Sequence, residues 1–249
     1  MPLLHNKTAL ITGASSGIGR AIALLFAEHG AKLVLTGRDP ARLAQTEAEV
    51  SERGADAISY VGDVCDEALH ARLLHLAADR FDGLDIAVNN AGGIGTVAPL
   101  AELSLAQWQD VIDVNLTSAF LGARHQIPAL LSRGGGTMMF TSSFVGTSVG
   151  IPGMAAYAAS KAALMGLVKG ITADYAAQGV RANALIVGGT DTPMAGSEEQ
   201  KIWAAGLHAV KRIAQPEEIA NAALFLASGM ASFVAGSALY VDGGNAAVK

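Results

Sequence analysis

The sequence contains little of what stabilises small secreted proteins. Only one of its 249 residues is a cysteine, Cys65, so the chain cannot form an internal disulfide. The first residues, MPLLHNKTAL, lack the basic region and the long apolar run of a secretory signal. Both absences favour a reducing compartment, and we therefore expect a cytoplasmic protein.

Charged residues are also scarce: they make up 16% of the chain, and the formal net charge is -5. Nucleic acids and anionic membranes attract basic surfaces, so we expect neither to be a partner. Residues 134–160 carry no charge, but they include six glycines, one proline and seven serines or threonines. This composition predicts a buried strand, a loop and a helix start, and not a membrane span.

The sequence offers no pattern of metal ligands. The six histidines are scattered, and His70 and His75 lie five residues apart, a spacing that does not place them on one helix face. We therefore expect no metal site. Cys65 is interpreted as a small packed residue and not as a nucleophile.

Apolar residues are abundant, at 51% of the chain, and they alternate between two patterns. Strand-length apolar runs occur at residues 8–12, 32–36, 57–61, 84–88, 137–141, 181–187 and 237–241. Between them lie segments of helical character, at residues 17–29, 40–53, 66–81, 105–131 and 154–178. Because no linker or repeat interrupts this alternation, we predict an α/β fold in which residues 1–249 form one domain around a seven-stranded parallel sheet. Residues 195–215 break the pattern, and we expect them to form a helical lid over the substrate.

The first strand leads into TGASSGIG, residues 12–19, where the glycines follow the pattern G-x-x-x-G-x-G. Glycine allows a tight turn and a close approach to pyrophosphate, which the N-terminus of the next helix would bind. Two other interpretations stay open. The turn could bind nothing, or Ser15 could be the nucleophile of a serine hydrolase, with Asp191 and His208 following in the order of that fold.

The second strand ends in LTGRDP, where a dinucleotide site selects between NAD and NADP. An acid at this place commonly binds the ribose hydroxyls of NAD, whereas an arginine can bind the 2′-phosphate of NADP. Arg38 therefore favours NADP(H), and the adjacent Asp39 leaves NAD(H) possible. A helix-capping turn with a solvated arginine would give the same letters.

Tyr157 and Lys161 lie four residues apart in the alanine-rich segment AAYAASK. This spacing places both side chains on one face of a helix. A tyrosine titrates near 10, and a neighbouring cation lowers that pKa by stabilising the phenolate. Such a tyrosine can exchange a proton with a carbonyl or alcohol oxygen, although a lone Tyr-x-x-x-Lys is also common in helices without any function.

Five motifs together give a specific resemblance. TGASSGIG at 12–19, NNAG at 89–92, Asn115, the two serines at 142–143 and YAASK at 157–161 occur in the order and approximate spacing of the short-chain dehydrogenase/reductase family. The chain resembles that family over essentially its whole length, down to the terminal LYVDGG. The resemblance implies a doubly wound, Rossmann-like sheet.

The resemblance also implies roles for individual residues. Tyr157 would be the catalytic acid/base, Lys161 would bind the nicotinamide ribose and lower the tyrosine pKa, and Ser143 would hydrogen-bond the substrate oxygen. By analogy alone, Asn115 would lie at a helix kink and hold a water molecule of the proton relay, whereas a mid-helix asparagine can also simply bond a neighbouring carbonyl. The cofactor would be bound by Tyr157 and Lys161 together with Gly13, Ser15, Ser16, Gly17, Ile18, Gly19, Arg38, Asp63, Val64, Asn89, Ala91, Gly92, Gly188, Thr190 and Thr192.

Two departures from the family pattern bear on the site. Ser143 lies fourteen residues before Tyr157, one more than the family leads us to expect, so either the loop between them bulges or Ser142 takes the role. The usual Pro-Gly after the sixth strand is replaced by Val187 and Gly188, which loosens the turn that positions the nicotinamide.

We therefore predict an NADP(H)-preferring oxidoreductase that interconverts a ketone and a secondary alcohol of small size. The resemblance implies a homotetramer or a homodimer. A dinucleotide-sensing binding protein without catalytic activity is the main alternative, and the intact set of Ser143, Tyr157 and Lys161 argues against it.

Overall fold

The computed structural model describes residues 2–248, which form a seven-stranded parallel sheet with the order β3-β2-β1-β4-β5-β6-β7. The strand order reverses between β1 and β4, where α/β sheets bind their ligands beyond the carboxyl ends of the strands. The predicted doubly wound fold is confirmed. The strands are β1 (Thr8–Thr12), β2 (Lys32–Gly37), β3 (Ala57–Val61), β4 (Ile86–Asn89), β5 (Gly136–Ser143), β6 (Val180–Val187) and β7 (Ala238–Val241).

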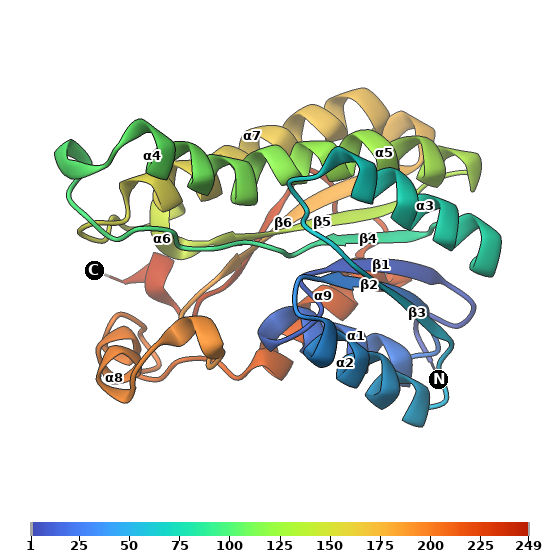
Figure 1. The fold of residues 1–249 in the computed structure, drawn as a ribbon, viewed down its shortest axis with the longest axis horizontal. Helices are drawn as coiled ribbons and strands as arrows, with labels where there is room; N and C mark the ends of the chain where they lie inside the picture. Colours follow the sequence, from blue (N-terminus) through green and yellow to red (C-terminus); the bar gives the residue numbers. More distant parts are fainter. Residues whose placement is uncertain (1, 249) are drawn as a thin grey trace.

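Helices cover both faces of the sheet (Figure 1). One layer consists of α1 (Gly17–Glu28), α2 (Pro40–Glu52) and α9 (Pro216–Ala227), and the other of α3 (Glu67–Phe81), α4 (Leu105–Ile112), α5 (Ser118–Ser132) and α7 (Ala155–Tyr175). Strand residues alternate between the layers: Ala9 and Ile11 belong to the first hydrophobic cluster and Leu10 to the second. Because helices cover both faces of the inner strands, these strands appear in the sequence as mostly apolar runs, whereas the edge strands β3 and β7 are partly exposed.

The shorter elements lie mainly near the carboxyl ends of the strands and after the helices. They are α6 (Phe144–Thr147) and α8 (Glu198–Gly206), the π-helical turn η2 (Asp113–Thr117), and the 3-10 turns η1 (Leu100–Glu102), η3 (Ala176–Gln178), η4 (Pro193–Ala195), η5 (Gly229–Ala231) and η6 (Asn245–Ala247). The predicted helix 105–131 is thus divided by η2. The predicted insertion at 195–215 contains α8, which Figure 1 shows apart from the sheet.

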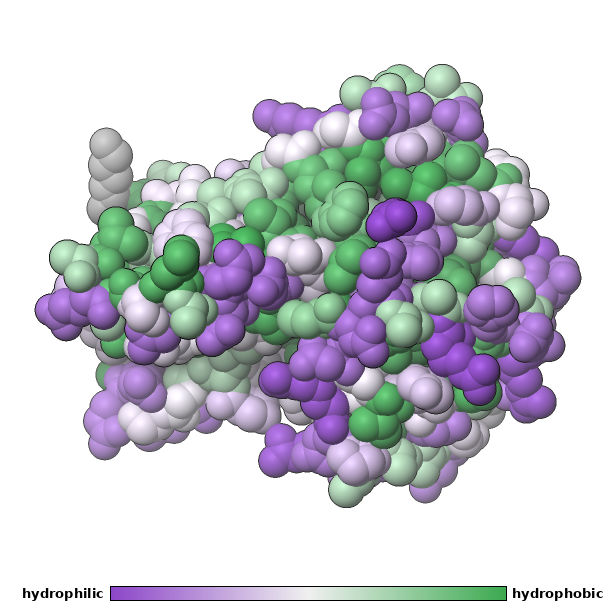
Figure 2. Space-filling model, turned by 45° about the horizontal axis from the view of Figure 1, so that its top comes forward, coloured by the Kyte–Doolittle hydropathy of each residue, from purple (hydrophilic) through white to green (hydrophobic). Residues whose placement is uncertain are grey.

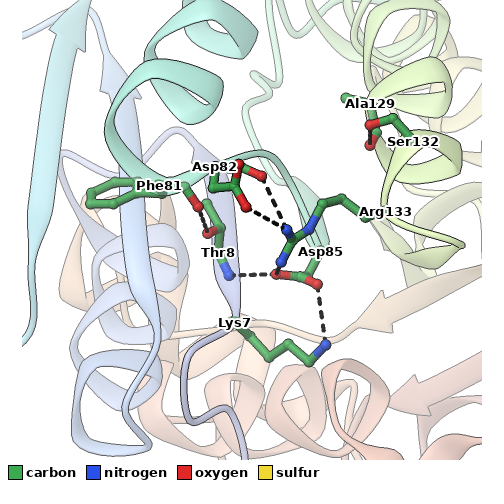
Figure 3. A network of polar contacts seen from close by, with 8 residues as sticks. All are labelled: Lys7, Thr8, Phe81, Asp82, Asp85, Ala129, Ser132 and Arg133. Atoms are coloured by element: carbon green, nitrogen blue, oxygen red, sulfur yellow. Dashed lines mark hydrogen bonds and ion pairs between the residues drawn. The ribbon is translucent and has the colours of Figure 1, made fainter.

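A polar network connects the segments at the amino ends of β1 and β4 (Figure 3). Asp85 is buried, and its carboxylate accepts a hydrogen bond from Thr8 N at 2.9 Å and pairs with Lys7 Nζ at 3.1 Å. Arg133, which follows α5, lies 3.0 Å from Asp82 and 3.9 Å from Asp85. This network joins β1, the end of α3, β4 and the end of α5. It lies at the amino ends of the strands, opposite the carboxyl ends where ligands bind.

No helix within residues 2–248 combines the length and the apolar character that a membrane span requires.

Candidate active site

A pocket of about 330 Å³ lies beyond the carboxyl ends of the central strands. It extends from the glycine-rich turn and the end of β2, past the end of β4, to α7 and the loop after β6. The structure brings thirteen of the predicted residues together there: Gly13, Ser15, Ser16, Gly17, Ile18, Arg38, Asp63, Val64, Ala91, Gly92, Tyr157, Lys161 and Thr192. The other predicted residues lie behind or beside this pocket, as described below.

The glycine-rich turn leaves no room for larger side chains. Gly13 and Gly17 have φ values of +68° and +52°, which favour glycine. A Cβ on Gly19 would lie 2.2 Å from Gly13 O, so Gly19 does not line the pocket but allows α1 to pack against the turn. Ser16, the N-cap of α1, makes no side-chain capping bond, and the first turn contains no acidic residue. The free amides of this helix therefore suit an anionic group such as a pyrophosphate.

Two arginines border the pocket where β2 ends. Arg38 and Arg42 both line it, and Arg38 is exposed and forms no ion pair among residues 2–248. The Asp39 carboxylate is engaged within its own helix, because it accepts hydrogen bonds from the amides of Ala41 and Arg42, each at 3.1 Å. Sequence reasoning missed Arg42, which lies in the first turn of α2 and also pairs with Asp39 at 3.4 Å.

The segment after β4 is held to the first strand. Thr12 Oγ1 accepts hydrogen bonds from the amides of Asn90 and Ala91, both at 3.0 Å, and Asn90 Nδ2 donates to Thr12 O at 3.1 Å. Asn90 thus lines the pocket, a position that the sequence analysis did not assign. Asn89 is buried instead, and its amide pairs reciprocally with that of Gln126 at 2.9 and 3.0 Å.

Tyr157 and Lys161 lie on one face of α7, as their spacing predicts. The Lys161 ammonium lies 5.8 Å from the centre of the Tyr157 ring and donates a hydrogen bond to Thr141 O at 2.7 Å. Lys161 is 4% exposed, and burial lowers its pKa to about 8.

The electrostatics of Tyr157 differ from the expectation. Burial raises the pKa of its phenol, and a hydrogen bond with Ser143 opposes this shift. The net shift of the Tyr157 pKa in the chain alone is therefore upward, opposite to the lowering expected from a neighbouring cation. The reason is that removing the phenolate from water costs more than the neighbouring groups restore.

The two candidate serines are the last residues of β5, and their hydroxyls make different contacts. Ser142 Oγ donates to Lys161 O at 2.7 Å, so its hydroxyl is engaged with α7. Ser143 lies beside Tyr157, whose pKa its side chain lowers, and Ser143 Oγ accepts a hydrogen bond from Val145 N at 3.1 Å. The next loop bulges at Gly146, where φ is +92° and where a Cβ would lie 2.2 Å from Ala158 O. This bulge accommodates the additional residue between Ser143 and Tyr157.

Asn115 lies at the centre of the π-helical turn η2 and is buried. Its Nδ2 donates to Gly93 O at 2.8 Å and to Val111 O at 3.1 Å, and its Oδ1 accepts from Gly93 N at 3.0 Å. The side chain therefore both bonds a neighbouring helical carbonyl and fixes the loop after β4. Because its amide interrupts the helix here, the predicted helix 105–131 is divided.

His208, from the segment after α8, holds the loop that follows β6. Its Nε2 accepts a hydrogen bond from Gly189 N at 3.0 Å, and its Nδ1 lies 2.7 Å from Asp242 O, to which it donates. A Cβ on Gly188 would lie 2.7 Å from the His208 ring, and Thr190 is buried with its hydroxyl bonded to Gly188 O at 3.0 Å. His208 thus fixes a turn that has no proline.

The same contacts exclude the serine-hydrolase interpretation. Both ring nitrogens of His208 are bonded to backbone groups, and Asp191 pairs with Lys201 at 2.7 Å. Ser15 lies in the glycine-rich turn, so the three residues form no triad.

The remaining candidates do not form a site. Cys65 is exposed and not packed as expected, and partial burial of its thiol beside Asp63 raises the pKa to about 11. A thiol with such a pKa is a poor nucleophile at neutral pH. Within residues 2–248, no group of three or more His, Cys, Asp or Glu side chains is arranged to hold a metal ion.

Comparison with known proteins identifies the family. Residues 13–246 match a family model described as Enoyl-(Acyl carrier protein) reductase. The chain is 37% identical over 239 residues to the cyclohexanol dehydrogenase of Acinetobacter sp. (strain SE19), covering 96% of this chain and 94% of that protein. The chain belongs to the short-chain dehydrogenase/reductase family. As a member of this family, it is an NAD(P)-dependent oxidoreductase.

Further short-chain dehydrogenases/reductases match over nearly their full length. The cis-4-hydroxycyclohexanecarboxylate dehydrogenase of Sinomonas cyclohexanicum is 40% identical over 246 residues, or 98% of each chain. The crystal structure of levodione reductase superposes with a TM-score of 0.93 at 32% identity, covering 99% of this chain and 100% of that chain. A structure from Beutenbergia cavernae, with a TM-score of 0.92, 37% identity and full coverage of both chains, contains NADP at low occupancy.

Proposed function

We propose that this protein is an NADP(H)-preferring oxidoreductase that interconverts a ketone and a secondary alcohol, with Tyr157 as the acid/base. The observation that carries the proposal is the arrangement of Ser143, Tyr157 and Lys161. The Ser143 side chain lies close enough to the phenol to lower its pKa, the ammonium lies 5.8 Å from the phenol ring, and Tyr157 and Lys161 line the pocket that begins at the glycine-rich turn.

The residues around this pocket fit a dinucleotide. Gly13 and Gly17 keep the backbone accessible, α1 presents free amides, and a Cβ on Gly37 would lie 2.0 Å from Ser15 Oγ. Arg38 and Arg42 would bind the 2′-phosphate, Thr192 and Lys161 would bind the nicotinamide end, and the reduced cofactor would supply the hydride.

The chain's own residues would manage the proton and the developing charge. Ser143 would donate a hydrogen bond to the substrate oxygen and so stabilise negative charge there as the carbonyl is reduced. Tyr157 would then donate its proton to the same oxygen and would accept it back in alcohol oxidation. Lys161, fixed by Thr141 O, places a positive charge beside the phenol when it is protonated.

We further propose an alicyclic secondary alcohol or ketone as the substrate class. Relatives at 37% and 40% identity are named for cyclohexanol and for a hydroxycyclohexanecarboxylate. The pocket is bordered by Met194, and α8 carries Ile202 and Trp203, which are 67% and 55% exposed. Met194 lines the same pocket as Tyr157, and an apolar side chain there suits an alicyclic ring.

The acid/base role is tested with Tyr157→Phe, which removes the proton without removing the ring. We expect NADPH-dependent reduction of cyclohexanone to fall at least about 100-fold, because general acid catalysis contributes that much or more. Calorimetry should show nearly unchanged NADPH binding. Turnover that survives the substitution would exclude Tyr157 from the role, and a wild-type protein that binds NADPH but reduces no ketone would favour a dinucleotide sensor.

The cofactor preference is tested by calorimetric titration with NADPH and NADH in parallel. We expect tighter binding of NADPH, and we expect Arg38→Asp to move the preference toward NADH because it repels the 2′-phosphate. The matched control is Arg72→Asp on α3, which changes the net charge equally but lies outside the residues that line the pocket. An unchanged ratio of affinities in Arg38→Asp would contradict the assignment.

A further inference from the structure

A second, much smaller cavity adjoins the main pocket, and Lys161 lines both. Its volume is about 10 Å³, close to the space that one water molecule occupies. Residues of α3, η2, α5 and α7 line it, together with the ends of β1, β4 and β5. The polar groups among them include His70, Asn115, Ser118 and Lys161, so the cavity can hold water.

His70 is the unusual member of this lining. It is 1% exposed, and its Nε2 lies 2.8 Å from Val64 O, a carbonyl that can only accept a hydrogen bond. Nε2 therefore carries the ring proton, and Nδ1 is an acceptor. Nδ1 is buried and has no hydrogen-bond partner within residues 2–248. A buried acceptor without a donor is unfavourable, because it has lost its hydrogen bonds to water, so a donor is expected in the adjacent cavity.

The polar side chains around the cavity differ in whether they have a hydrogen-bonding group left for a molecule inside it. Both N–H donors of the Asn115 amide are used by Gly93 O and Val111 O, and Ser118 donates its hydroxyl to Val114 O at 2.7 Å. The Lys161 ammonium has three N–H groups, and the structure gives it one protein acceptor, Thr141 O. Lys161 thus retains donors for the cavity, and His70 offers it a free acceptor.

The family resemblance implies a water molecule of the proton relay in this region. We propose that His70 Nδ1 accepts a hydrogen bond from a water molecule in this cavity to which Lys161 donates, which makes His70 a positioning residue for the proton path behind Tyr157. The role of His70 in catalysis rests on the proposed function. The water itself does not depend on it.

The charges around His70 keep Nδ1 free to accept. Burial lowers the pKa of His70, and His125 of α5, stacked on it at 6.3 Å, acts in the same direction. Asp66 and Glu67 at the start of α3 oppose this shift, and Lys161 faces the ring's cavity from α7. Burial is the largest of the causes, so the ring is neutral at neutral pH and accepts through Nδ1.

Two substitutions separate the two ring nitrogens. His70→Asn places an amide oxygen near the position of Nδ1 but loses the bond to Val64 O. His70→Gln reaches Val64 O with its amide but leaves no acceptor near Nδ1. The bond to Val64 is structural, so a merely structural role predicts that His70→Asn is the more damaged variant. The proposal predicts the reverse for catalysis.

For His70→Gln we expect kcat for ketone reduction to fall about tenfold, as the loss of one hydrogen bond in a proton path would cause. The solvent deuterium isotope effect on kcat should increase, while NADPH affinity measured by calorimetry stays unchanged. His70→Asn should retain kcat within about threefold. A His70→Gln enzyme with wild-type kcat and isotope effect, or equal losses in both variants, would overturn the proposal.

A high-resolution crystal structure of the wild-type protein tests the water without any turnover. We expect an ordered water within hydrogen-bonding distance of His70 Nδ1 in the wild type and in His70→Asn, but not in His70→Gln. An empty cavity beside Nδ1 in the wild type would refute the proposal. If the water is present but no ketone is reduced, then the proposed function fails and the water site stands.

Discussion

At the scale of single residues, the buried ammonium of Lys161 opposes stability. Its pKa is lowered from 10.5 to about 8, so below pH 8 the folded chain keeps a charge in a place that disfavours it. The unfolded chain binds more protons between these two values, and the free energy of unfolding therefore rises as the pH increases from about 8 to 10.5.

We predict that Lys161→Met abolishes turnover and yet stabilises the protein at pH 7. The upper limit of this gain is about 3 kcal/mol, less the value of the hydrogen bond to Thr141 O. Urea unfolding at pH 7 and at pH 10 measures it, and the advantage of the variant should shrink at the higher pH. A variant less stable than wild type at both values would contradict this account.

Also at this scale, the limits of sequence reasoning are clear. The spacing of Tyr157 and Lys161 predicts their common helix face, because helical geometry is regular. His70 and His208 could not be found in this way. Each is a lone histidine whose partners, Val64 O, Gly189 N and Asp242 O, are backbone groups brought to it by the fold. Backbone partners leave no residue-type signal in a sequence.

At the scale of elements, the strands and most helices begin and end within a few residues of the prediction, because apolar periodicity and caps such as Asp39-Pro40 are local signals. The division of helix 105–131 was not predicted from its pattern, since it depends on Asn115 bonding Gly93, twenty-two residues away. The segment 195–215 was correctly expected to contain a helix. Its function as a lid stays a prediction.

Ion pairs connect this segment to the rest of the chain at two places. Lys201 of α8 lies 2.7 Å from Asp191, and Arg212 makes two hydrogen bonds to Glu218 of α9, at 2.6 and 2.7 Å. Arg212 lowers the pKa of Glu218 to about 2. The stability that the Arg212–Glu218 pair contributes is therefore fully present above the ordinary pKa of a carboxyl group, and it is lost only as the pH falls toward 2.

We predict that Lys201→Met raises the substrate KM about two- to fivefold, because an exposed ion pair contributes up to about 1 kcal/mol to holding α8. NADPH affinity should change little. Steady-state kinetics at low and high salt measure the effect, which salt should reproduce in the wild type. Lys169→Met, an exposed lysine of α7 without a recorded partner in residues 2–248, is the matched control. Identical KM values in both variants would show that the pair does not hold a lid.

At the scale of the whole molecule, the network around Asp85 and the candidate active site lie at opposite ends of the strands. We predict that Asp85→Ala lowers the free energy of unfolding by about 1–3 kcal/mol, because the Thr8 amide loses its buried partner. At 25 °C kcat/KM should be unchanged. Asp79→Ala, an exposed acid on α3, is the control for the loss of charge. An Asp85→Ala protein with wild-type stability would show that the network in Figure 3 contributes nothing to the free energy of unfolding.

The surface also bears on assembly. Figure 2 shows apolar areas between polar groups on the side that carries α4 and α5, where Leu105 and Phe120 are 81% and 50% exposed. Phe233, between α9 and β7, is fully exposed. We predict a homotetramer or a homodimer, which light scattering after gel filtration measures. Phe120→Asp should lower the molecular mass of the assembly, and a wild-type protein that is a monomer would refute the prediction.

The end of β5 also determines how this enzyme can change. Two consecutive residues hold α7: Thr141 O accepts a hydrogen bond from the Lys161 ammonium, and Ser142 Oγ donates one to the Lys161 backbone carbonyl. The next residue, Ser143, lies beside Tyr157. The proposed acid/base pair is therefore held at the centre of the sheet, whereas α8 is joined to its surroundings by an ion pair at the protein surface. We predict that laboratory evolution of the substrate range concentrates its changes in α8, because they leave the contacts of Tyr157 and Lys161 intact.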